Sequence, residues 1–155
     1  MALILGLGCG PGFFSIEMAR MVGESGRVIA SDLQEGMLQK LRDKIQGTQL
    51  NKRIALHQCG ENEIGLTDKV DFALLFYVLH EIPDQEGVFR ELATLLKPGG
   101  KVLLVEPPIH VSKQVFDESL RKAQNAGLNM TERPRILLCK TAILEAGRQS
   151  PALSR

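Results

Sequence analysis

The sequence has few cysteines and no excess of either charge. Its three cysteines, Cys9, Cys59 and Cys139, are odd in number and contain no C-x-x-C pair. We therefore expect neither a disulfide framework nor a zinc ribbon, and a reducing cytoplasm is the predicted location. Nineteen basic residues stand against eighteen acidic ones, a net charge of +1. This balance gives no electrostatic reason to expect nucleic acid or an anionic membrane as a partner.

Long apolar runs are also missing. The longest one, residues 72–79, is far shorter than the roughly 20 residues that a membrane-spanning helix needs. The apolar start at residues 1–7 lacks a basic region and runs into glycines instead of a small-residue cleavage site. We therefore predict neither a membrane span nor a signal peptide.

Short apolar runs alternate with amphipathic stretches along the whole chain, a pattern typical of a mainly parallel α/β sheet. The length of 155 residues fits one domain, which we place at residues 1–147 with a tail at 148–155. The strands predicted from apolar runs are 2–7, 27–32, 54–58, 70–76, 101–105, 128–132 and 136–144. Helices are predicted over 12–22, from about Met37 to Gly47, from Pro83 with an apolar face that includes Leu96, and from Ser112 to Gly127.

The last two predicted strands are separated only by residues 133–135. So short a link permits antiparallel pairing but no parallel crossover, which needs a dozen or more residues. The sheet should therefore end in an antiparallel hairpin.

Three alternating glycines, Gly8, Gly10 and Gly12, follow the first predicted strand and open a helix. Glycine lets the backbone turn sharply and approach a ligand, and the start of a helix offers unpaired N–H groups to an anion. A carboxylate or phosphate would suit this position. The alternative is a tight strand-to-helix turn without a ligand.

Asp32 ends the second predicted strand, about 20 residues past the last of these glycines. There its carboxylate can accept hydrogen bonds from both hydroxyls of a ribose. The alternative is a solvated carboxylate that caps the next helix. Together with the glycines, the spacing favours a nucleoside site.

These residues resemble the class I S-adenosylmethionine-dependent methyltransferases, especially the small-molecule group that includes ubiquinone and menaquinone biosynthesis enzymes. The resemblance covers nearly the whole chain. It rests on residues 7–12 (Leu-Gly-Cys-Gly-Pro-Gly), Ser31-Asp32 followed by Met37-Leu38, Val70-Asp71-Phe72 leading to Leu79-His80, and residues 96–100 (Leu-Lys-Pro-Gly-Gly).

The resemblance implies a Rossmann-like three-layer sandwich with seven strands in the order 3-2-1-4-5-7-6, and S-adenosylmethionine as cofactor. In this arrangement the glycine turn holds the methionine part, Asp32 the ribose and Leu33 one face of the adenine, with Glu61 and Asn62 beside the adenine edge. The cofactor-binding residues implied by the resemblance are Gly8, Cys9, Gly10, Gly12, Phe13, Asp32, Leu33, Glu61, Asn62 and Phe76.

The sequence departs from the family in two ways. Gly6 stands where the family usually has an acidic residue, two places before the first glycine of the turn. The sequence also begins at the first strand, so we expect a cofactor site without the N-terminal helices that normally cover it. Both departures predict weakened cofactor binding.

Methyl transfer requires alignment of the acceptor with the sulfonium, and orientation of this kind can contribute about 7 to 11 kcal/mol. A base is needed only where the acceptor must lose a proton. We predict His80 and Glu81 as catalytic residues, with Tyr77 and His110 as further candidates. For His80-Glu81 the alternative is a loop pair with local hydrogen bonds. No metal site is predicted, because Asp84 stands where an H-E-x-x-H motif needs its second histidine.

The predicted function is methyl transfer from S-adenosylmethionine to a small-molecule acceptor. One alternative is a nicotinamide-dependent oxidoreductase, whose G-x-G-x-x-G fingerprint fails because its third glycine falls on Pro11, Phe13 or Ser15. The other is a non-catalytic binding module with the same fold, suggested by Gly6 and the missing cover.

Overall fold

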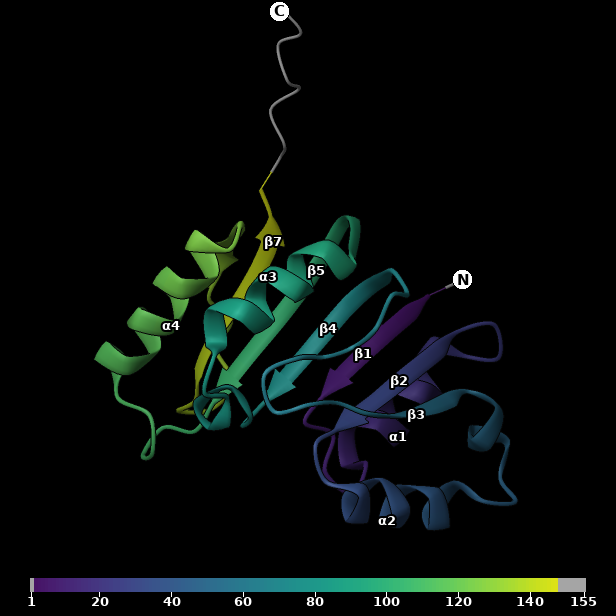
Figure 1. Cartoon of the computed structure of the whole chain (residues 1–155). Helices are drawn as coiled ribbons and strands as arrows, with labels where there is room; N and C mark the ends of the chain where they lie inside the picture. The colour runs from purple at the N-terminus through teal and green to yellow at the C-terminus, as the bar shows by residue number, and fades with distance from the viewer. Residues whose placement is uncertain (1, 148–155) are drawn as a thin grey trace, which may run out of the picture.

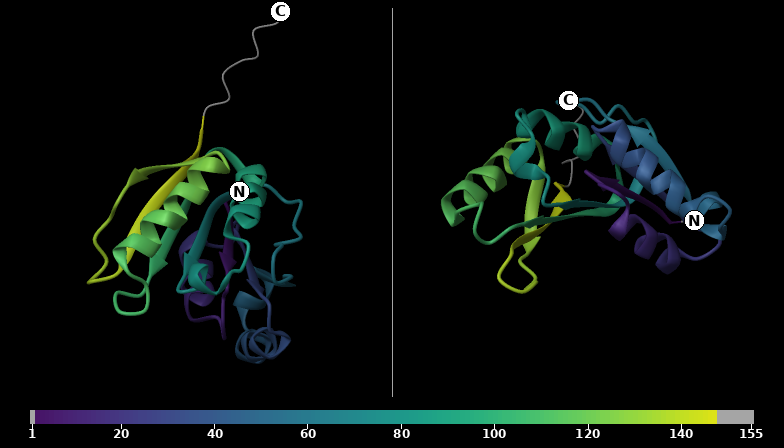
Figure 2. Two further views of the ribbon diagram at one scale, coloured as in Figure 1. Left: turned by 60° about the vertical axis from the view of Figure 1, so that its left-hand side comes forward. Right: turned by 90° about the horizontal axis from the view of Figure 1, so that it is seen from below.

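The computed structural model describes residues 2–147, so the predicted tail at 148–155 lies outside the described residues. Its centre is one sheet of seven strands in the order β3-β2-β1-β4-β5-β7-β6, with helices on both sides (Figures 1 and 2). This order confirms the α/β fold with a Rossmann-like sheet. The strands are β1 (Leu3–Leu7), β2 (Arg27–Asp32), β3 (Ile54–Gln58), β4 (Val70–Phe76), β5 (Leu96–Glu106), β6 (Leu128–Glu132) and β7 (Lys140–Ala146). The helices are α1 (Phe13–Val22), α2 (Glu35–Ile45), α3 (Gln85–Leu95) and α4 (Lys113–Asn125), with short 3-10 turns η1 (Gln49–Lys52) and η2 (Leu79–Glu81).

The direction of the strands decides where the loops gather. All neighbours from β3 to β5 pair in parallel, whereas β7 is antiparallel to both β5 and β6. The arrowheads of β1, β4 and β5 therefore lie along one edge of the sheet (Figure 1), which we call the carboxyl edge. In open α/β sheets, ligands bind in the crevice outside this edge.

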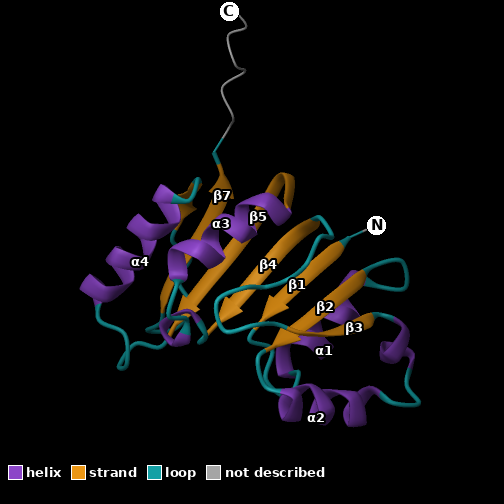
Figure 3. Ribbon diagram, viewed as in Figure 1, coloured by secondary structure: helices purple, strands orange, loops and turns teal. Residues whose placement is uncertain are grey.

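The core consists of two clusters on opposite faces of the sheet. Side chains alternate along a strand, and β2 shows this directly: Val28 and Ala30 pack with α1 and α2, whereas Ile29 packs with the larger cluster under α3 and α4. Figure 3 shows α3 and α4 together over β4, β5 and β7. Phe89 of α3 and Phe116 of α4 are fully or almost fully buried in that larger cluster.

β5 begins at Leu96, five residues before the predicted start, so placing Leu96 on the face of the preceding helix was wrong. Leu96 takes an extended conformation and pairs with Val70, and the register then shifts so that Lys101 pairs with Phe72. Residues 97–100 bulge out of the pairing, with Gly99 at φ 78°. The Pro-Gly-Gly sequence interrupts the strand here without marking its beginning.

The terminal hairpin is confirmed, but β7 begins at Lys140, four residues later than predicted. The N–H of Cys139 donates to the carbonyl of Ile136, and Leu137 has a φ of 50°. Residues 136–139 therefore form part of the connection. Leu137 and Leu138 are 93% and 84% exposed. Because both are apolar, the sequence predicted that the strand begins too early.

Candidate functional site

The glycine turn after β1 has backbone angles that favour glycine. Gly8, Gly10 and Gly12 have φ values of 70°, 55° and 94°. A Cβ added at Gly8 would collide with Val78, and one added at Gly12 would collide with Leu41. A Cβ at Gly10 would meet no atom within 4 Å. Two of the glycines are thus required by protein packing, whereas Gly10 presents open backbone to a ligand.

Asp32 fixes the shape of this turn from the end of β2. Its Oδ2 accepts a hydrogen bond from the N–H of Gly10 at 2.9 Å, and its Oδ1 accepts one from the N–H of Gln34 at 2.9 Å. A carboxylate oxygen can accept more than one hydrogen bond, so both oxygens keep capacity for a ligand. Asp32 therefore shapes the glycine turn, a structural role beyond the helix cap that was considered from the sequence.

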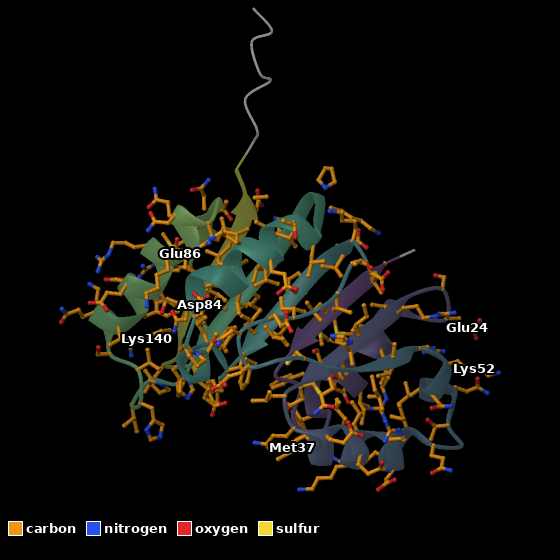
Figure 4. All side chains as sticks on the ribbon, viewed as in Figure 1. Glu24, Met37, Lys52, Asp84, Glu86 and Lys140 are labelled. Atoms are coloured by element: carbon orange, nitrogen blue, oxygen red, sulfur yellow. The ribbon has the colours of Figure 1, made fainter. Side chains whose placement is uncertain are left out.

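A cavity of about 340 Å³ opens at the carboxyl edge beside Gly10 and Asp32. This volume falls within the range of about 300–1,000 Å³ that is common for small-molecule sites. The predicted site residues that line it are Gly8, Gly10, Asp32, Leu33, Glu61 and Glu81. Apolar residues that were not predicted complete the wall: Met37, Ile64, Val78, Ile82 and Val88. Met37 is labelled in Figure 4, near the beginning of α2.

Other predicted cofactor residues lie outside this cavity. Cys9, Phe13 and Phe76 line an adjoining cavity of about 200 Å³, which shares only Leu7 and Gly8 with the first. Asn62 lines neither, and its Oδ1 accepts a hydrogen bond from the N–H of Asp84 at 3.2 Å. Gly12 also lines neither cavity, but it precedes the first residue of α1.

Aromatic rings connect the two cavities. The ring of Phe76 lies 4.4 Å from that of Phe14 and stacks on Tyr77 at 4.2 Å between centroids. Tyr77 lines the larger cavity at a φ of 57°, which is a rare conformation for a bulky residue. Its hydroxyl lies 3.2 Å from the Sγ of Cys139. Backbone strain of this kind concentrates at functional sites.

Gly6, which replaces the usual acidic residue, lies against α1. A Cβ added there would lie 3.3 Å from the Cε of Met18 and 3.6 Å from the Oγ of Ser15. The terminal methyl of Met18 would have to shift by a few tenths of an ångström to admit a side chain at this position.

The predicted catalytic pair separates in the structure. Glu81 lines the larger cavity, but His80 does not. The Nδ1 of His80 lies 2.7 Å from the Oε2 of Glu106, which ends β5 and is 1% exposed. The other oxygen of Glu106 accepts a hydrogen bond from the N–H of Leu79 at 3.1 Å. Burial raises the pKa of the Glu106 carboxyl, and the hydrogen bond with His80 counteracts part of this rise.

Glu106 was not predicted as a site residue, although the sequence contains a signal for it. Residues i, i+2 and i+4 of a strand share a face, which places Glu106 on the same side as the core residues Val102 and Leu104. A charged residue at a core position is rarely fully buried unless it is paired. At the carboxyl edge, such a residue indicates a functional partner nearby.

Metal-binding clusters and membrane-spanning helices are both absent from the described residues 2–147. No three histidine, cysteine, aspartate or glutamate side chains among them are grouped so that they could hold a metal ion. No helix in this part of the chain is both long and apolar enough to cross a membrane.

Cys9 is expected to resist alkylation in the folded protein. Burial, and then the nearby charge of Asp32, raises its pKa to about 12. Only the thiolate reacts, so about one Cys9 in 10⁴ is reactive at about pH 8. Mass spectrometry after short exposure to iodoacetamide would measure this, with protein unfolded in guanidinium as the control. Equal Cys9 modification in folded and unfolded protein would contradict the expectation.

Comparison with known proteins identifies the family of this chain. The methyltransferase domain family matches residues 4–100. The demethylmenaquinone methyltransferase of Lactobacillus johnsonii is 38% identical over 103 residues, which cover 66% of this chain and 42% of that protein. The ubiquinone/menaquinone biosynthesis C-methyltransferase UbiE of Cronobacter sakazakii is 32% identical over 124 residues, or 79% of this chain and 47% of that protein. The chain belongs to the methyltransferase domain family.

Solved structures agree with this assignment. A SAM-dependent methyltransferase from Aquifex aeolicus superposes with a TM-score of 0.82 at 26% identity, covering 92% of this chain and 81% of that one. The matches confirm the predicted class, the S-adenosylmethionine-dependent methyltransferases, and favour neither the oxidoreductase nor the non-catalytic module. The chain spans less than half the length of the curated relatives described above.

Proposed function

We propose that this chain binds S-adenosylmethionine in the cavity at Gly10 and Asp32 and transfers its methyl group to a quinone-type small molecule. The observation that carries the proposal is the hydrogen bond between the Asp32 carboxylate and the N–H of Gly10. It brings the Asp32 carboxylate, which would accept from the ribose hydroxyls, beside the open backbone of the glycine turn in one cavity. The residues present therefore fit the cofactor.

Each part of the cofactor has a place in this arrangement. The backbone of Gly8 and Gly10 would hold the amino-acid end, the free lone pairs of Asp32 the ribose hydroxyls, and Leu33 one face of the adenine. Glu61 lies in the same wall, where it could accept from the adenine amine. Asn62 would act indirectly, because its hydrogen bond to the N–H of Asp84 holds the loop that carries Glu61.

Bound S-adenosylmethionine supplies an electrophilic methyl group on a sulfonium. The chain's contribution is to hold the acceptor in line with that group and to exclude water. Orientation alone can supply about 7 to 11 kcal/mol of rate acceleration. Tyr77 and Val78 line the larger cavity, Phe76 lines the smaller one, and the stacked rings of Phe76 and Tyr77 would form a boundary between cofactor and acceptor.

A quinone-type acceptor is supported by the names of the relatives, which act on demethylmenaquinone or in ubiquinone and menaquinone biosynthesis as C-methyltransferases. The smaller cavity agrees with an aromatic, apolar acceptor. Its walls include Phe14, Phe76, Leu74 and Met18. Flat aromatic molecules pack well against such rings.

Thermal unfolding tests the proposal. S-adenosylmethionine and S-adenosylhomocysteine should raise the melting temperature, whereas NAD and NADP should not. A ligand at a hundredfold excess over its dissociation constant stabilises by about 2.7 kcal/mol. Asp71→Asn is the control variant, because Asp71 lies at the opposite edge of the sheet. The ligands should change its melting temperature as much as they change that of the wild type. Stabilisation by NAD but by neither sulfur nucleoside would refute the proposal.

A further inference from the structure

Three large aliphatic side chains are exposed on two loops at the carboxyl edge. Ile109 lies in the loop between β5 and α4, whereas Leu137 and Leu138 lie in the connection between β6 and β7. Their exposed fractions are 88%, 93% and 84%. Single exposed apolar residues are ordinary, but a group of them on one surface marks an interaction site.

The two loops lie side by side and are joined to each other. The pairing of Glu106 with Lys140 brings the end of β5 next to the beginning of β7. The Nζ of Lys140 also donates to the carbonyl of Pro108 at 3.0 Å. Figure 2 (left) shows both loops extending beyond the same edge of the sheet. Residues 107–113 and 132–140 therefore form one surface, which we call the docking loops.

The requirements of folding do not explain Leu137. Its φ of 50° lies in the left-handed region, which bulky side chains rarely adopt. Its side chain is almost fully exposed, so no buried contact offsets the cost of this conformation. The N–H of Cys139 donates to the carbonyl of Ile136, and the hydroxyl of Thr141 donates to that of Pro134. The loop thus holds a strained leucine outward, and strain of this kind concentrates where a residue serves an external contact.

The docking loops are basic, although the whole chain has a net charge of only +1. They contain one acidic and four basic residues: Glu132, Lys113, Arg133, Arg135 and Lys140. Arg133 forms an ion pair with Asp117 at 3.1 Å. Lys113 and Arg135 form no ion pair within residues 2–147, so their charges are available to a partner. The overall balance of charge conceals this local excess.

The charge changes sign along the carboxyl edge. The larger cavity includes no lysine or arginine among its lining residues but has four carboxylates: Asp32, Glu61, Glu63 and Glu81. These carboxylates follow β2, β3 and β4, whereas the docking loops follow β5 and precede β7. An anionic surface therefore attracts the β5–β7 end of the edge and repels the end that holds the larger cavity.

We propose that the docking loops bind the surface of an anionic lipid bilayer. The three exposed aliphatic side chains enter the boundary between headgroups and acyl chains, and Lys113 and Arg135 contact the headgroup phosphates. Apolar side chains flanked by basic ones bind membranes in this way, through buried apolar area and attraction to anionic lipid. A symmetric contact with a second copy would instead place the basic residues of the two copies against each other. The charge thus favours lipid as the occupant.

The docking loops are also in contact with the aromatic rings beside the smaller cavity. The hydroxyl of Tyr77 lies 3.2 Å from the Sγ of Cys139, and the ring of Tyr77 stacks on Phe76, which contacts Phe14. Phe14 and Phe76 line the smaller cavity. Docking itself requires neither cofactor nor acceptor and goes beyond the proposed function. If that function holds, an apolar acceptor dissolved in lipid reaches the smaller cavity along this row of rings.

Vesicle flotation measures the binding. The wild type should bind vesicles of equal parts phosphatidylglycerol and phosphatidylcholine at least about tenfold more tightly than pure phosphatidylcholine. Leu137→Asn/Leu138→Ser should weaken binding to the anionic vesicles by about tenfold or more, because two aliphatic side chains no longer leave water. Asparagine tolerates a left-handed backbone, so the melting temperature should not fall. Met21→Ser is the control, because Met21 is 84% exposed but lies near the end of α1, and it should bind like the wild type.

Lys113→Gln/Arg135→Gln tests the contribution of charge. A basic residue close to an anionic bilayer contributes about fivefold to binding, so this variant should bind the anionic vesicles about 25-fold more weakly. Lys40→Gln/Lys52→Gln removes the same charge from another part of the surface and should bind like the wild type. Figure 4 shows Lys52 and Lys140 on opposite sides of the molecule.

Absence of wild-type binding to the anionic vesicles would overturn the proposal. An equal loss in both charge variants would also contradict it, because binding would then follow the total charge and not the docking loops. A wild-type dimer in analytical ultracentrifugation that Leu137→Asn/Leu138→Ser converts to a monomer would assign the surface to a second copy instead. None of these measurements uses S-adenosylmethionine, so a failure to bind that cofactor would overturn the proposed function alone.

Discussion

Gly8→Ala is expected to lower both the stability of the fold and its affinity for S-adenosylmethionine. The residue has a φ of 70°, and left-handed backbone costs a non-glycine residue about 1–2 kcal/mol. Its new Cβ would also collide with Val78, and overpacking of this kind typically costs about 1–3 kcal/mol. Together these effects predict a loss of about 2–5 kcal/mol in the free energy of unfolding.

Gly10→Ala should behave differently. It bears only the backbone strain, about 1–2 kcal/mol, because a Cβ there meets no protein atom within 4 Å. Cofactor affinity should nevertheless fall, since the new methyl group would occupy the space where the ligand approaches. Urea unfolding and calorimetric titration would measure the two quantities separately.

Gly36→Ala supplies the control for both variants. This glycine lies inside α2, has no atom within 4 Å of an added Cβ, and has no positive φ. Alanine there should stabilise the protein by about 0.4–1 kcal/mol and leave binding unchanged. If Gly8→Ala had the same urea midpoint as the wild type, the expected collision between the new Cβ and Val78 would be refuted.

Asp32→Ala should reduce cofactor affinity strongly and also destabilise the protein. The substitution removes acceptors from the N–H groups of Gly10 and Gln34 as well as from the ribose. Hydrogen bonds to a charged group contribute about 1.5–3 kcal/mol each, so the loss of one ribose hydrogen bond alone should lower affinity about 10- to 150-fold. Stability should fall by about 2–4 kcal/mol, because water can reach the partly exposed site and replace part of the loss.

The same two measurements check this expectation, with Glu35→Ala as the control. Glu35 lies close in sequence and is exposed, with only a surface ion pair to Arg42 at 3.6 Å. Such pairs contribute little, about 0–1 kcal/mol. A variant Asp32→Ala that lost affinity without any loss of stability would show that the turn holds its shape without the carboxylate.

The fold was largely predictable because its signals are local. Apolar runs bounded by glycine or proline identified the strands, and the short link at 133–135 identified the hairpin. The errors came where two local signals disagreed. Leu96 continues the apolar face of α3 in the sequence, yet pairing with Val70 draws it into β5. Leu137 and Leu138 look like strand residues but lie exposed in a turn.

The site was predictable in part. Gly10 and Asp32 were predicted from residue type and spacing alone, and both line the cavity. The strand alternation marks Glu106 as a buried charge, but its partner could not be assigned, because His80 lies 26 residues earlier and meets it only through the pairing of β4 with β5. Asn62 was predicted as a ligand contact, and its Oδ1 also accepts from the N–H of Asp84, a contact that only the folded loops bring about. Contacts between distant loops are the part that local pattern does not encode.

The buried Glu106 also has a consequence for the proton balance of folding. Because its native pKa is raised, the native state binds this proton more tightly than the unfolded state does. Its contribution to stability is therefore present at low pH and is lost as the pH rises through the native pKa. Asp71, at the opposite edge, has a lowered pKa, first through the N–H of Leu3 and then through Lys97. Its contribution is present above its unfolded pKa and is lost as the pH falls through the native pKa. Folding thus takes up a proton at Glu106 at pH values above the unfolded pKa of that carboxyl and releases one at Asp71 below the unfolded pKa of the other, so the two ends of the sheet respond to acid in opposite directions.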